Sequence, residues 1–514
     1  MYLHSLKLKN FKGFRGESDE IYFHGPNGNP GSGLNILVGE NNAGKSTLLD
    51  AICFLRDHAA QKKDPTSIAP SASVVQNETS ERDLPIQDEC AVIGEFAENS
   101  PQAMLANIET FTNSKHQKAV KALLTTTAHI RCRRHWQDQD KRKKLFFLHD
   151  GEGFDADGRN PTGLDVFLKG SLDFHTFWAD DNAEDEASYG ANKPCLNLLT
   201  DILRQISTTT EYAQLQTAFK NLFVNQNSTL RRNIAGVEQL ISSQFQAFFG
   251  TGNLHFEFPQ PSVDQFVKAL SLIIDLDYSL ALSENGHGVQ RIAALALLTA
   301  WASVQAASNK KGQKPYIFLL DEPELCLHPR GQAQLLKALL EISRHYQVFV
   351  TTHSPIFLHS PEIKRANLLL CRKVKSATVV SPESKFAKTL PYSPTWGEIC
   401  WFAYNMPTVE FHNELYGFIQ EKSGKTTIKD ADELIRKTFQ QIGIQRPLYT
   451  WTRYDKNNKI IKEDRSLSYY VRNAIHHPDN PFIETGFVEN HLEESINDML
   501  QVVEHLQSCS STTP

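Results

Sequence analysis

Three short runs of apolar residues, far apart in the chain, each stop at polar or glycine-rich sequence. Leu34 to Val38 reads LNILV, residues 316–320 read YIFLL, and residues 347–351 read QVFVT. Such runs, bounded by polar residues, are typical of buried strands in a parallel sheet. An amphipathic segment follows the first run. The pattern over residues 33–52 therefore predicts a strand, a loop and a helix.

The rest of the chain has a different pattern. Residues 97–264 show no sustained heptads and contain proline, glycine and acidic clusters, which predicts a compact, mainly helical lobe rather than long coiled-coil arms. The run at 292–307 is short for a membrane span and carries Trp, Ser and Gln, so it predicts a buried helix. The last segment is mostly helical in pattern. We expect one α/β domain in two halves, 1–96 and 265–395. A helical insertion, 97–264, separates the two halves, and a helical tail, 396–514, follows them.

Composition narrows the class of protein. The chain has 514 residues, of which 40% are hydrophobic and 22% charged, as in an ordinary globular protein. The net charge of −6 argues against general coating of nucleic acid. The eight cysteines have no C-x-x-C spacing, which favours the reduced thiols of a cytoplasmic protein and gives no indication of zinc. No segment predicts insertion in a membrane.

The loop after the first apolar run carries a phosphate-binding pattern. Residues 39–46 read GENNAGKS and fit G-x-x-x-x-G-K-S. Its glycines let backbone N–H groups turn toward phosphate oxygens, at a helix N-terminus that already favours anions. Lys45 would reach the β- and γ-phosphates, and the Ser46 hydroxyl would ligate Mg²⁺. We expect ATP and Mg²⁺ to be held by Gly39, Asn41, Asn42, Gly44, Lys45, Ser46 and Thr47.

The other two apolar runs end in residues that would complete this site. YIFLL is followed by Asp321 and Glu322, which can supply one carboxylate to Mg²⁺ and a second to the attacking water. QVFVT leads to His353, which can contact the γ-phosphate or orient the water. The alternative is that Asp321 and Glu322 are solvated acids at a strand end and that His353 is an ordinary loop histidine. Because the carboxyl ends of parallel strands meet at one edge of a sheet, the nucleotide site is the stronger interpretation.

A second glycine-rich segment precedes another helical pattern. Residues 282–298 read LSENGHGVQRIAALALL, with Ser283, Gly286 and Gly288 ahead of a helix that starts near Val289. Glycines at the start of a helix favour an N-terminus that can bind an anion. Since the P-loop already supplies one such end, the second suggests a contact with the γ-phosphate of another subunit. A glycine hinge before a core helix is the alternative.

Five segments together carry a resemblance to a known family. LHSLKLKNFKGF, GENNAGKST, LSENGHGVQR, LLDEPELCLHP and TTHSP stand in the order found in ABC-type ATPases of the SMC, RecF and OLD group. The resemblance covers about 1–96 and 265–395. NGHGVQR departs from the family's L-S-G-G-Q pattern. It is similar to ATPases of bacterial anti-phage systems, namely the PtuA-like subunits of Septu and certain retrons, and the AriA-like subunits of PARIS.

The resemblance implies a fold and an assembly. The fold class is α/β, a P-loop ABC-type ATPase head with a parallel-rich sheet, a mainly helical insertion and a helical C-terminal domain. Two subunits would form a head-to-head dimer with two ATPs, each held between one P-loop and the other subunit's signature. Ser283 and Gly286 would make this contact across the dimer. The family's Q-loop glutamine is not assigned.

A basic run lies in the expected insertion. Residues 131–144 read RCRRHWQDQDKRKK, with seven Lys or Arg around Trp136. Basic residues beside an aromatic ring can bind a phosphate backbone and stack a base. A solvated strand-turn-strand with a charged hairpin tip fits equally well, because one run does not show which side chains share a face. Both alternatives stay open.

The tail offers one candidate for a second activity. Its D-x-D, Asp430 and Asp432, fits the first turn of an amphipathic helix better than a metal-binding nuclease site. Residues 470–480 read YVRNAIHHPDN and resemble the R-N-x-x-x-H motif of HEPN ribonucleases at Arg472, Asn473 and His477. The family's arginine holds the scissile phosphate and its histidine moves a proton. The alternative is the polar end of a packed helix.

These features predict an ATP-binding and ATP-hydrolysing subunit of a bacterial anti-phage defence system. ATP would hold a dimer that senses infection and gates a separate nuclease or toxin subunit. Two alternatives remain open. One is the same ATPase with a HEPN-like ribonuclease in the same chain, and the other is a DNA-repair ATPase of RecF type.

Overall fold

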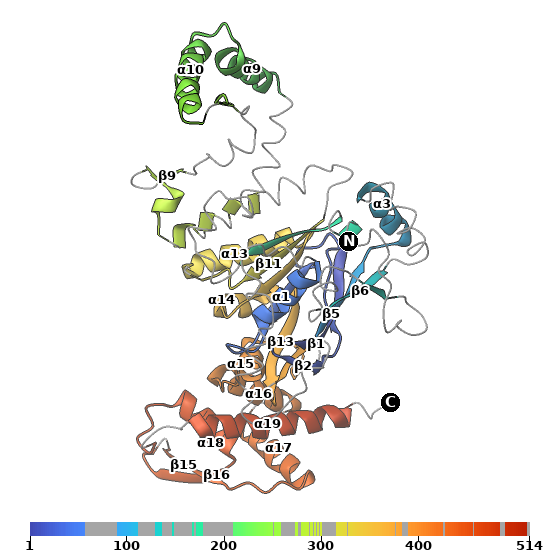
Figure 1. Ribbon diagram of the computed structural model, residues 1–514. Helices are drawn as coiled ribbons and strands as arrows, with labels where there is room; N and C mark the ends of the chain where they lie inside the picture. The colour runs from blue at the N-terminus through green and yellow to red at the C-terminus, as the bar shows by residue number, and fades with distance from the viewer. Residues whose placement is uncertain are drawn as a thin grey trace. The chain divides into compact units, whose positions relative to one another are not determined.

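The computed structural model describes most of the chain and divides it into two units (Figure 1). The first unit comprises Met1–His175, Lys310–Glu324 and Pro329–Pro514, and the second comprises Thr176–Asn309 and Leu325–His328. The described residues are 1–56, 90–111, 129–135, 146–148, 167–168, 171–177, 209–249, 251–258, 273–275, 279–286, short helical pieces between 288 and 300, 315–325, 327–375, 377–382, 389–424, 427–455, 457–483 and 489–510.

A mostly parallel sheet contains the three strands predicted from the apolar runs. Its order is β14 (Ala377–Pro382), β13 (Asn367–Val374), β4 (Leu34–Val38), β12 (Gln347–Thr351), β11 (Tyr316–Asp321) and β8 (Asp173–Phe177). The four strands from β13 to β11 pair in parallel, and β14 is antiparallel to β13. Every residue of β4 and β12 is buried, as expected for strands covered on both faces. The predicted α/β class is confirmed.

A second, antiparallel sheet is built around the first strand of the chain. Its order is β2 (Phe14–Glu17), β1 (Tyr2–Phe11), β5 (Ala91–Ala97), β6 (His129–His135) and β7 (Phe146–Leu148), with β3 (Ile21–Tyr22) also paired to β1. The sheet therefore continues beyond residue 97, where the sequence placed the start of the insertion. Because β6 pairs with β5 along its whole length, it belongs to this sheet.

The structure removes one residue from the nucleic-acid alternative for the basic run. Arg134, in the basic run, is only 1% exposed, and its Nε donates to the Leu55 carbonyl oxygen. Arg131 forms an ion pair with Glu20. β6 and β7 are antiparallel neighbours, in agreement with the strand-turn-strand alternative. Arg133 of β6 is partly buried, and the other basic residues of the run, within 136–145, lie outside the described residues.

Helix α1 (Lys45–Arg56) begins at the phosphate-binding loop and packs against strands of both sheets. Its buried side chains include Leu48, Ile52 and Leu55, each at 0% exposure. A Cβ at Gly94 of β5 would lie 2.0 Å from a Leu55 methyl group, so glycine allows this close approach of helix and strand. These contacts hold α1 closely against the two sheets.

Helices complete the first unit (Figure 1). α13 (Pro329–Ile342) follows β11 and buries one face of leucines, as expected from its amphipathic sequence. The shorter α14 (Pro355–Leu358) follows β12, with the Ser354 side chain as its N-cap. α3 (Pro101–Phe111) follows β5.

The end of the chain is mostly helical, as predicted. Its elements are α15 (Trp396–Tyr404), α16 (Val409–Lys422), α17 (Ile428–Gln441), β15 (Tyr449–Tyr454), β16 (Ile460–Arg465), α18 (Leu467–His476) and α19 (Glu489–Ser510). α16 to α19 share one apolar core that includes Phe411, Ile435 and Ile496. The hairpin β15–β16 was not predicted. Asp430 caps α17 and Asp432 is buried against Arg465, in agreement with a structural role for this D-x-D.

The described part of the second unit includes a pair of helices joined through a π-helical turn. These are α9 (Thr210–Phe219), η2 (Lys220–Val224) and α10 (Thr229–Phe249). The hairpin of β9 (Ile273–Asp275) and β10 (Ser279–Ala281) leads to η3 (Leu282–Glu284). Ile292, in the run predicted to be a buried helix, is helical but 49% exposed. No helix in the described part of the chain combines the length and the hydropathy that a membrane span requires.

Candidate functional site

The phosphate-binding loop connects the carboxyl end of β4 to α1. Gly39 has φ of +148°, Asn42 +63° and Gly44 +99°, so three positions of the loop lie in the left-handed region. A Cβ at Gly39 would lie 2.0 Å from the Cys371 carbonyl oxygen of the neighbouring strand β13. The sequence requirement for glycine here comes from the backbone path as well as from the need to approach a phosphate. Asn41 and Asn42 are exposed.

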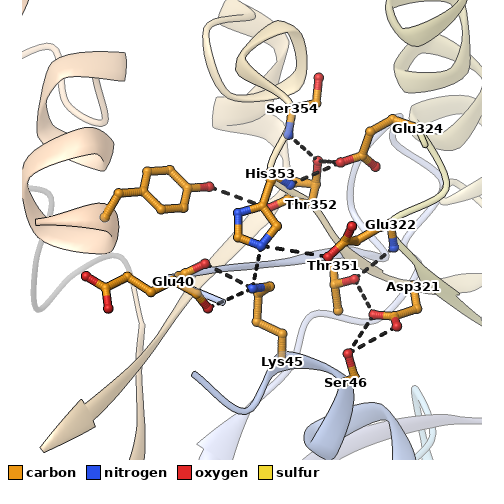
Figure 2. A network of polar contacts seen from close by, with 12 residues as sticks. Glu40, Lys45, Ser46, Asp321, Glu322, Glu324, Thr351, Thr352, His353 and Ser354 are labelled. Atoms are coloured by element: carbon orange, nitrogen blue, oxygen red, sulfur yellow. Dashed lines mark hydrogen bonds and ion pairs between the residues drawn. The ribbon is translucent and has the colours of Figure 1, made fainter. Parts of the chain in front are cut away.

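Lys45 lies at the first position of α1, and its side chain is buried. Its Nζ donates to the carbonyl oxygens of Gly39, at 2.9 Å, and Glu40, at 3.0 Å. A third contact, of 2.7 Å, joins Nζ to Nε2 of His353 (Figure 2). The ammonium group therefore has partners for its three N–H donors and is aimed along the inside of the loop.

Ser46 of α1 and Asp321 of β11 face one another at the edge of the sheet. Thr47 follows Ser46 on α1. The Ser46 hydroxyl lies 3.0 and 3.1 Å from the two carboxylate oxygens of Asp321. Thr351, the last residue of β12, donates to Asp321 Oδ1 at 2.5 Å. β11 and β12 are parallel and in register at Asp321 and Thr351, which brings these two strand ends together. The carboxylate is thus fixed from two sides (Figure 2).

These groups suit Mg²⁺, which the phosphate-binding pattern implies. Mg²⁺ prefers oxygen ligands and keeps several waters, so a protein commonly supplies only one or two carboxylates beside the substrate phosphates. A hydroxyl and a carboxylate about 3 Å apart, at the mouth of the P-loop, meet this requirement. Among the described residues, no group of three or more His, Cys, Asp or Glu side chains forms a denser metal site.

Glu322 follows Asp321 in a sharp turn. Its φ is +45°, unusual for a residue with a side chain, and its backbone N–H donates to both the carbonyl and the hydroxyl oxygen of Thr351. The turn points the Glu322 carboxylate toward the loop after β12. Its Oε1 lies 3.7 Å from His353 Nε2. A partly exposed carboxylate, beside a histidine and a buried lysine, is placed to accept a proton or hold a water.

Burial sets the electrostatics of the site. It lowers the pKa of the Lys45 ammonium, although Cys371 and the nearby carboxylates oppose this shift. Burial and the positive charge of Lys45 lower the pKa of His353. The neutral imidazole is therefore favoured, and its Nε2 lone pair accepts from Lys45. Phosphates bound there would be stabilised by the Lys45 ammonium and the N–H groups of the loop, whereas the carboxylates of Asp321 and Glu322 require a cation such as Mg²⁺ beside them.

Two residues of the site were not predicted from the sequence. Thr351 is the polar last residue of β12, which the pattern of the strand end could have indicated. Glu324 is 6% exposed and accepts hydrogen bonds from the Thr352 hydroxyl, at 2.6 Å, and the His353 N–H, at 3.0 Å. It is the second glutamate of DEPEL, and nothing in the sequence indicates that it reaches the loop after β12.

The structure thus brings together five of the predicted residues, namely Lys45, Ser46, Asp321, Glu322 and His353. The second glycine-rich segment belongs to the second unit. There, the Gly286 carbonyl accepts from the N–H groups of Val289 and Gln290, so a helical turn begins close to the predicted position, at Gly288. The backbone of Ser283 lies in η3.

The predicted motif of the tail lies at the end of α18. Asn473 is 2% exposed and accepts a hydrogen bond from Arg472 Nη1 at 3.2 Å. His477 is exposed, and its ring lies 6.5 Å from that of Trp451. The structure therefore joins Arg472 to Asn473, while His477 contacts the hairpin. These contacts agree with the alternative of a polar helix end.

Comparison with known sequences gives one family match and two curated relatives. A family model described as an AAA ATPase domain matches residues 1–358. The Old nuclease of Escherichia phage P2 is 23% identical over 349 residues, which are 64% of this chain and 54% of that protein. An uncharacterized protein of Methanocaldococcus jannaschii is 31% identical over 81 residues, 16% of this chain and 21% of the relative. The chain therefore spans about half of the first relative and less of the second.

Comparison with solved structures finds SMC head domains. The SMC head domain from Thermotoga maritima covers 74% of this chain and 99% of its own, with 17% identity and a TM-score of 0.32. An SMC head bound to the C-winged helix domain of ScpA covers 74% of this chain and 98% of its own, with 13% identity and a TM-score of 0.40.

Proposed function

The chain belongs to the family of AAA ATPase domains, and we propose that it is an ABC-type ATPase subunit of a bacterial anti-phage defence system. It binds and hydrolyses ATP with Mg²⁺. One observation carries the nucleotide chemistry: the ammonium of Lys45, the Ser46–Asp321 pair and the Glu322–His353 pair converge at the carboxyl ends of β4, β11 and β12. A parallel sheet binds its ligand at this edge.

Each side chain has a distinct part in hydrolysis. Lys45 exchanges its carbonyl and histidine partners for oxygens of the β- and γ-phosphates. Ser46 and Asp321 hold Mg²⁺, which supplies positive charge to the phosphates of the bound nucleotide. Glu322 orients the attacking water and accepts its proton, and His353 contacts the γ-phosphate. Thr351 keeps the Asp321 carboxylate in place.

The active assembly in this proposal is a dimer. Ser283, Gly286 and Gly288 of one subunit contact the γ-phosphate bound at the P-loop of the other. The resemblance of LSENGHGVQR to an ABC-type signature supports this, as does a helical turn that starts on the Gly286 carbonyl. ATP binding closes the dimer and hydrolysis reopens it. The closed state controls a separate nuclease or toxin subunit, and the helical tail is a surface on which that subunit docks.

The test of the nucleotide site compares two lysine substitutions on the purified chain. Lys45→Ala removes charge-assisted hydrogen bonds to phosphate, so we expect ATP affinity to fall by about 10- to 100-fold. Lys337→Ala, at an exposed position of α13, is the matched control. Binding is measured by fluorescent nucleotide titration and hydrolysis by phosphate release. Equal ATP affinity in the two variants would contradict the assignment of the P-loop.

The defence role needs a cellular test. Cells that carry the chain together with its neighbouring reading frame are challenged with phage, and the Lys45→Ala chain serves as the inactive control. We expect protection that depends on Lys45. ATP-dependent binding of the purified chain to DNA junctions, without any protection, would favour the RecF-type alternative instead.

A further inference from the structure

The loop that carries His353 is held from two sides. On one side, the buried carboxylate of Glu324 accepts from the Thr352 hydroxyl and the His353 N–H. On the other side, the Tyr404 ring lies 5.7 Å from the His353 ring, with 32° between the planes. The Tyr404 hydroxyl also donates to the Thr352 carbonyl oxygen, at 3.5 Å. Glu324 comes from the turn after β11, whereas Tyr404 comes from the helical tail.

Tyr404 is the last residue of α15, and α15 is firmly attached to the tail. Thr395 and Glu398 form a capping box at its start, and Glu398 is fully buried. A Cβ at Gly397 would lie 2.7 Å from Phe411 of α16, so the backbones of the two helices pack closely. α15 is thus closely packed on α16, whose Phe411 belongs to the apolar core of the tail.

His353 is also the hydrogen-bond partner of Lys45, the residue whose contacts would change most when a nucleotide binds. Its Nε2 contacts Lys45 Nζ at 2.7 Å. Phosphates that bind Lys45 compete for this ammonium, so the imidazole must adopt another hydrogen-bond partner or move. The Tyr404 ring packs against that imidazole. The hydroxyl remains a donor, since burial raises the pKa of Tyr404.

We propose that Tyr404 is a positioning residue that couples His353 to the helical tail, so that ATP at the P-loop alters α15 and α16. This inference rests on the proposed ATPase function and deepens it, because it names the contact through which the nucleotide bound at the P-loop affects the tail. The coupling is reciprocal. A partner that binds the tail and shifts α15 changes the rate of hydrolysis through Tyr404.

The experiment separates the aromatic contact from general folding of the tail. Tyr404→Leu removes the ring beside His353, while Tyr404→Phe keeps it and removes only the long hydrogen bond. Tyr392→Leu is the control, because Tyr392 belongs to the same region, is 44% exposed and contacts Glu414 rather than His353. ATP affinity, kcat and amide hydrogen exchange across 396–422 are measured for each chain, with and without Mg·ATP.

The expected results differ between the variants. Tyr404→Leu keeps ATP affinity within about twofold but lowers kcat by about tenfold, the scale expected when a catalytic group is misplaced. It also loses the ATP-dependent change in hydrogen exchange at α15 and α16. Tyr404→Phe and Tyr392→Leu behave like the parent chain.

Two outcomes overturn the inference, and they are distinguishable. If the parent chain hydrolyses ATP and Tyr404→Leu matches Tyr392→Leu in kcat and in hydrogen exchange, the coupling is wrong while the ATPase function stands. If the parent chain does not bind ATP, the proposed function fails and the coupling fails with it. If the parent chain binds ATP but does not hydrolyse it, the ATP-dependent change in hydrogen exchange at α15 and α16, compared between the parent chain and Tyr404→Leu, still tests the coupling.

Discussion

The chemistry of the site depends on single residues that each take an unusual position. Glu322 is the clearest example, because its φ of +45° is sustained by two hydrogen bonds from its N–H to Thr351. Left-handed backbone at a residue with a side chain costs free energy, and such strain is concentrated at functional sites. Here it turns the carboxylate toward His353, which an extended strand end would not do.

Glu322→Gln tests the role of this carboxylate. The amide has the same shape and the same backbone requirement, but it cannot accept a proton. We expect parental affinity for ATP, hydrolysis slower by at least about 100-fold, and a dimer that persists in Mg·ATP. Light scattering during gel filtration measures the dimer, and phosphate release measures turnover. Glu341→Gln, an exposed glutamate of α13, is the control. Parental turnover in Glu322→Gln would show that another group is the base.

At the scale of elements, the tail depends on one buried histidine between two helices. His412 of α16 is 0% exposed, and its Nε2 lies 2.9 Å from the Ser495 hydroxyl of α19. Burial lowers the pKa of His412 to about 3, and Arg472 and His476 of α18 act in the same direction. The histidine is therefore neutral in the folded tail, and charging it would place a buried cation between α16 and α19.

This shift predicts a loss of stability in acid. The unfolded chain takes up a proton near pH 6.5 and the folded tail only near pH 3, so the free energy of unfolding falls as the pH drops below 6.5. Between pH 7 and pH 5 the loss from this residue is about 2 kcal/mol. His412→Gln should remove that part of the loss, whereas His345→Gln, at an exposed position, should not. Urea unfolding at both pH values measures it. Equal pH dependence in parent and His412→Gln would refute the prediction.

The elements also show what the sequence could predict. The strands β4, β11 and β12 were predicted because a buried parallel strand is apolar along its whole length. The hairpin β15–β16 was missed because it is largely exposed, with Trp451 its buried side chain, and so lacks an apolar run. The basic run at 131–144 left two alternatives open, because a run of charges does not reveal that one of its arginines, Arg134, is buried.

At the scale of the whole chain, the site is assembled from residues hundreds of positions apart. Ser46 and Asp321 are 275 residues apart, and Lys45 and His353 are 308 apart. Motifs identified these residues because each stands at a strand end with a chemistry that ATP requires. Glu324 and Tyr404 could not be found in this way. Their contacts with Thr352 depend on how a turn and a distant helix pack, which no local pattern encodes.

The same limit applies to the possible second activity in the tail. Arg472, Asn473 and His477 match a ribonuclease motif by sequence, but the structure gives them different environments. Asn473 is buried and paired with Arg472, whereas His477 is exposed at the end of α18. A ribonuclease needs the histidine for proton transfer, and packing needs the asparagine. Substitutions at the two positions therefore separate catalysis from stability.

We expect His477→Ala to change the free energy of unfolding by no more than about 0.5 kcal/mol, since surface substitutions rarely cost more. Asn473→Ala should cost about 1–2 kcal/mol, because it leaves Arg472 without its buried acceptor. We expect no RNA cleavage by the parent chain or by either variant. Unfolding is followed by circular dichroism, and cleavage by incubation with labelled RNA. Because His477→Ala is predicted to keep the fold intact, cleavage by the parent that disappears in this variant alone would establish a ribonuclease in the tail and displace its role as a docking surface.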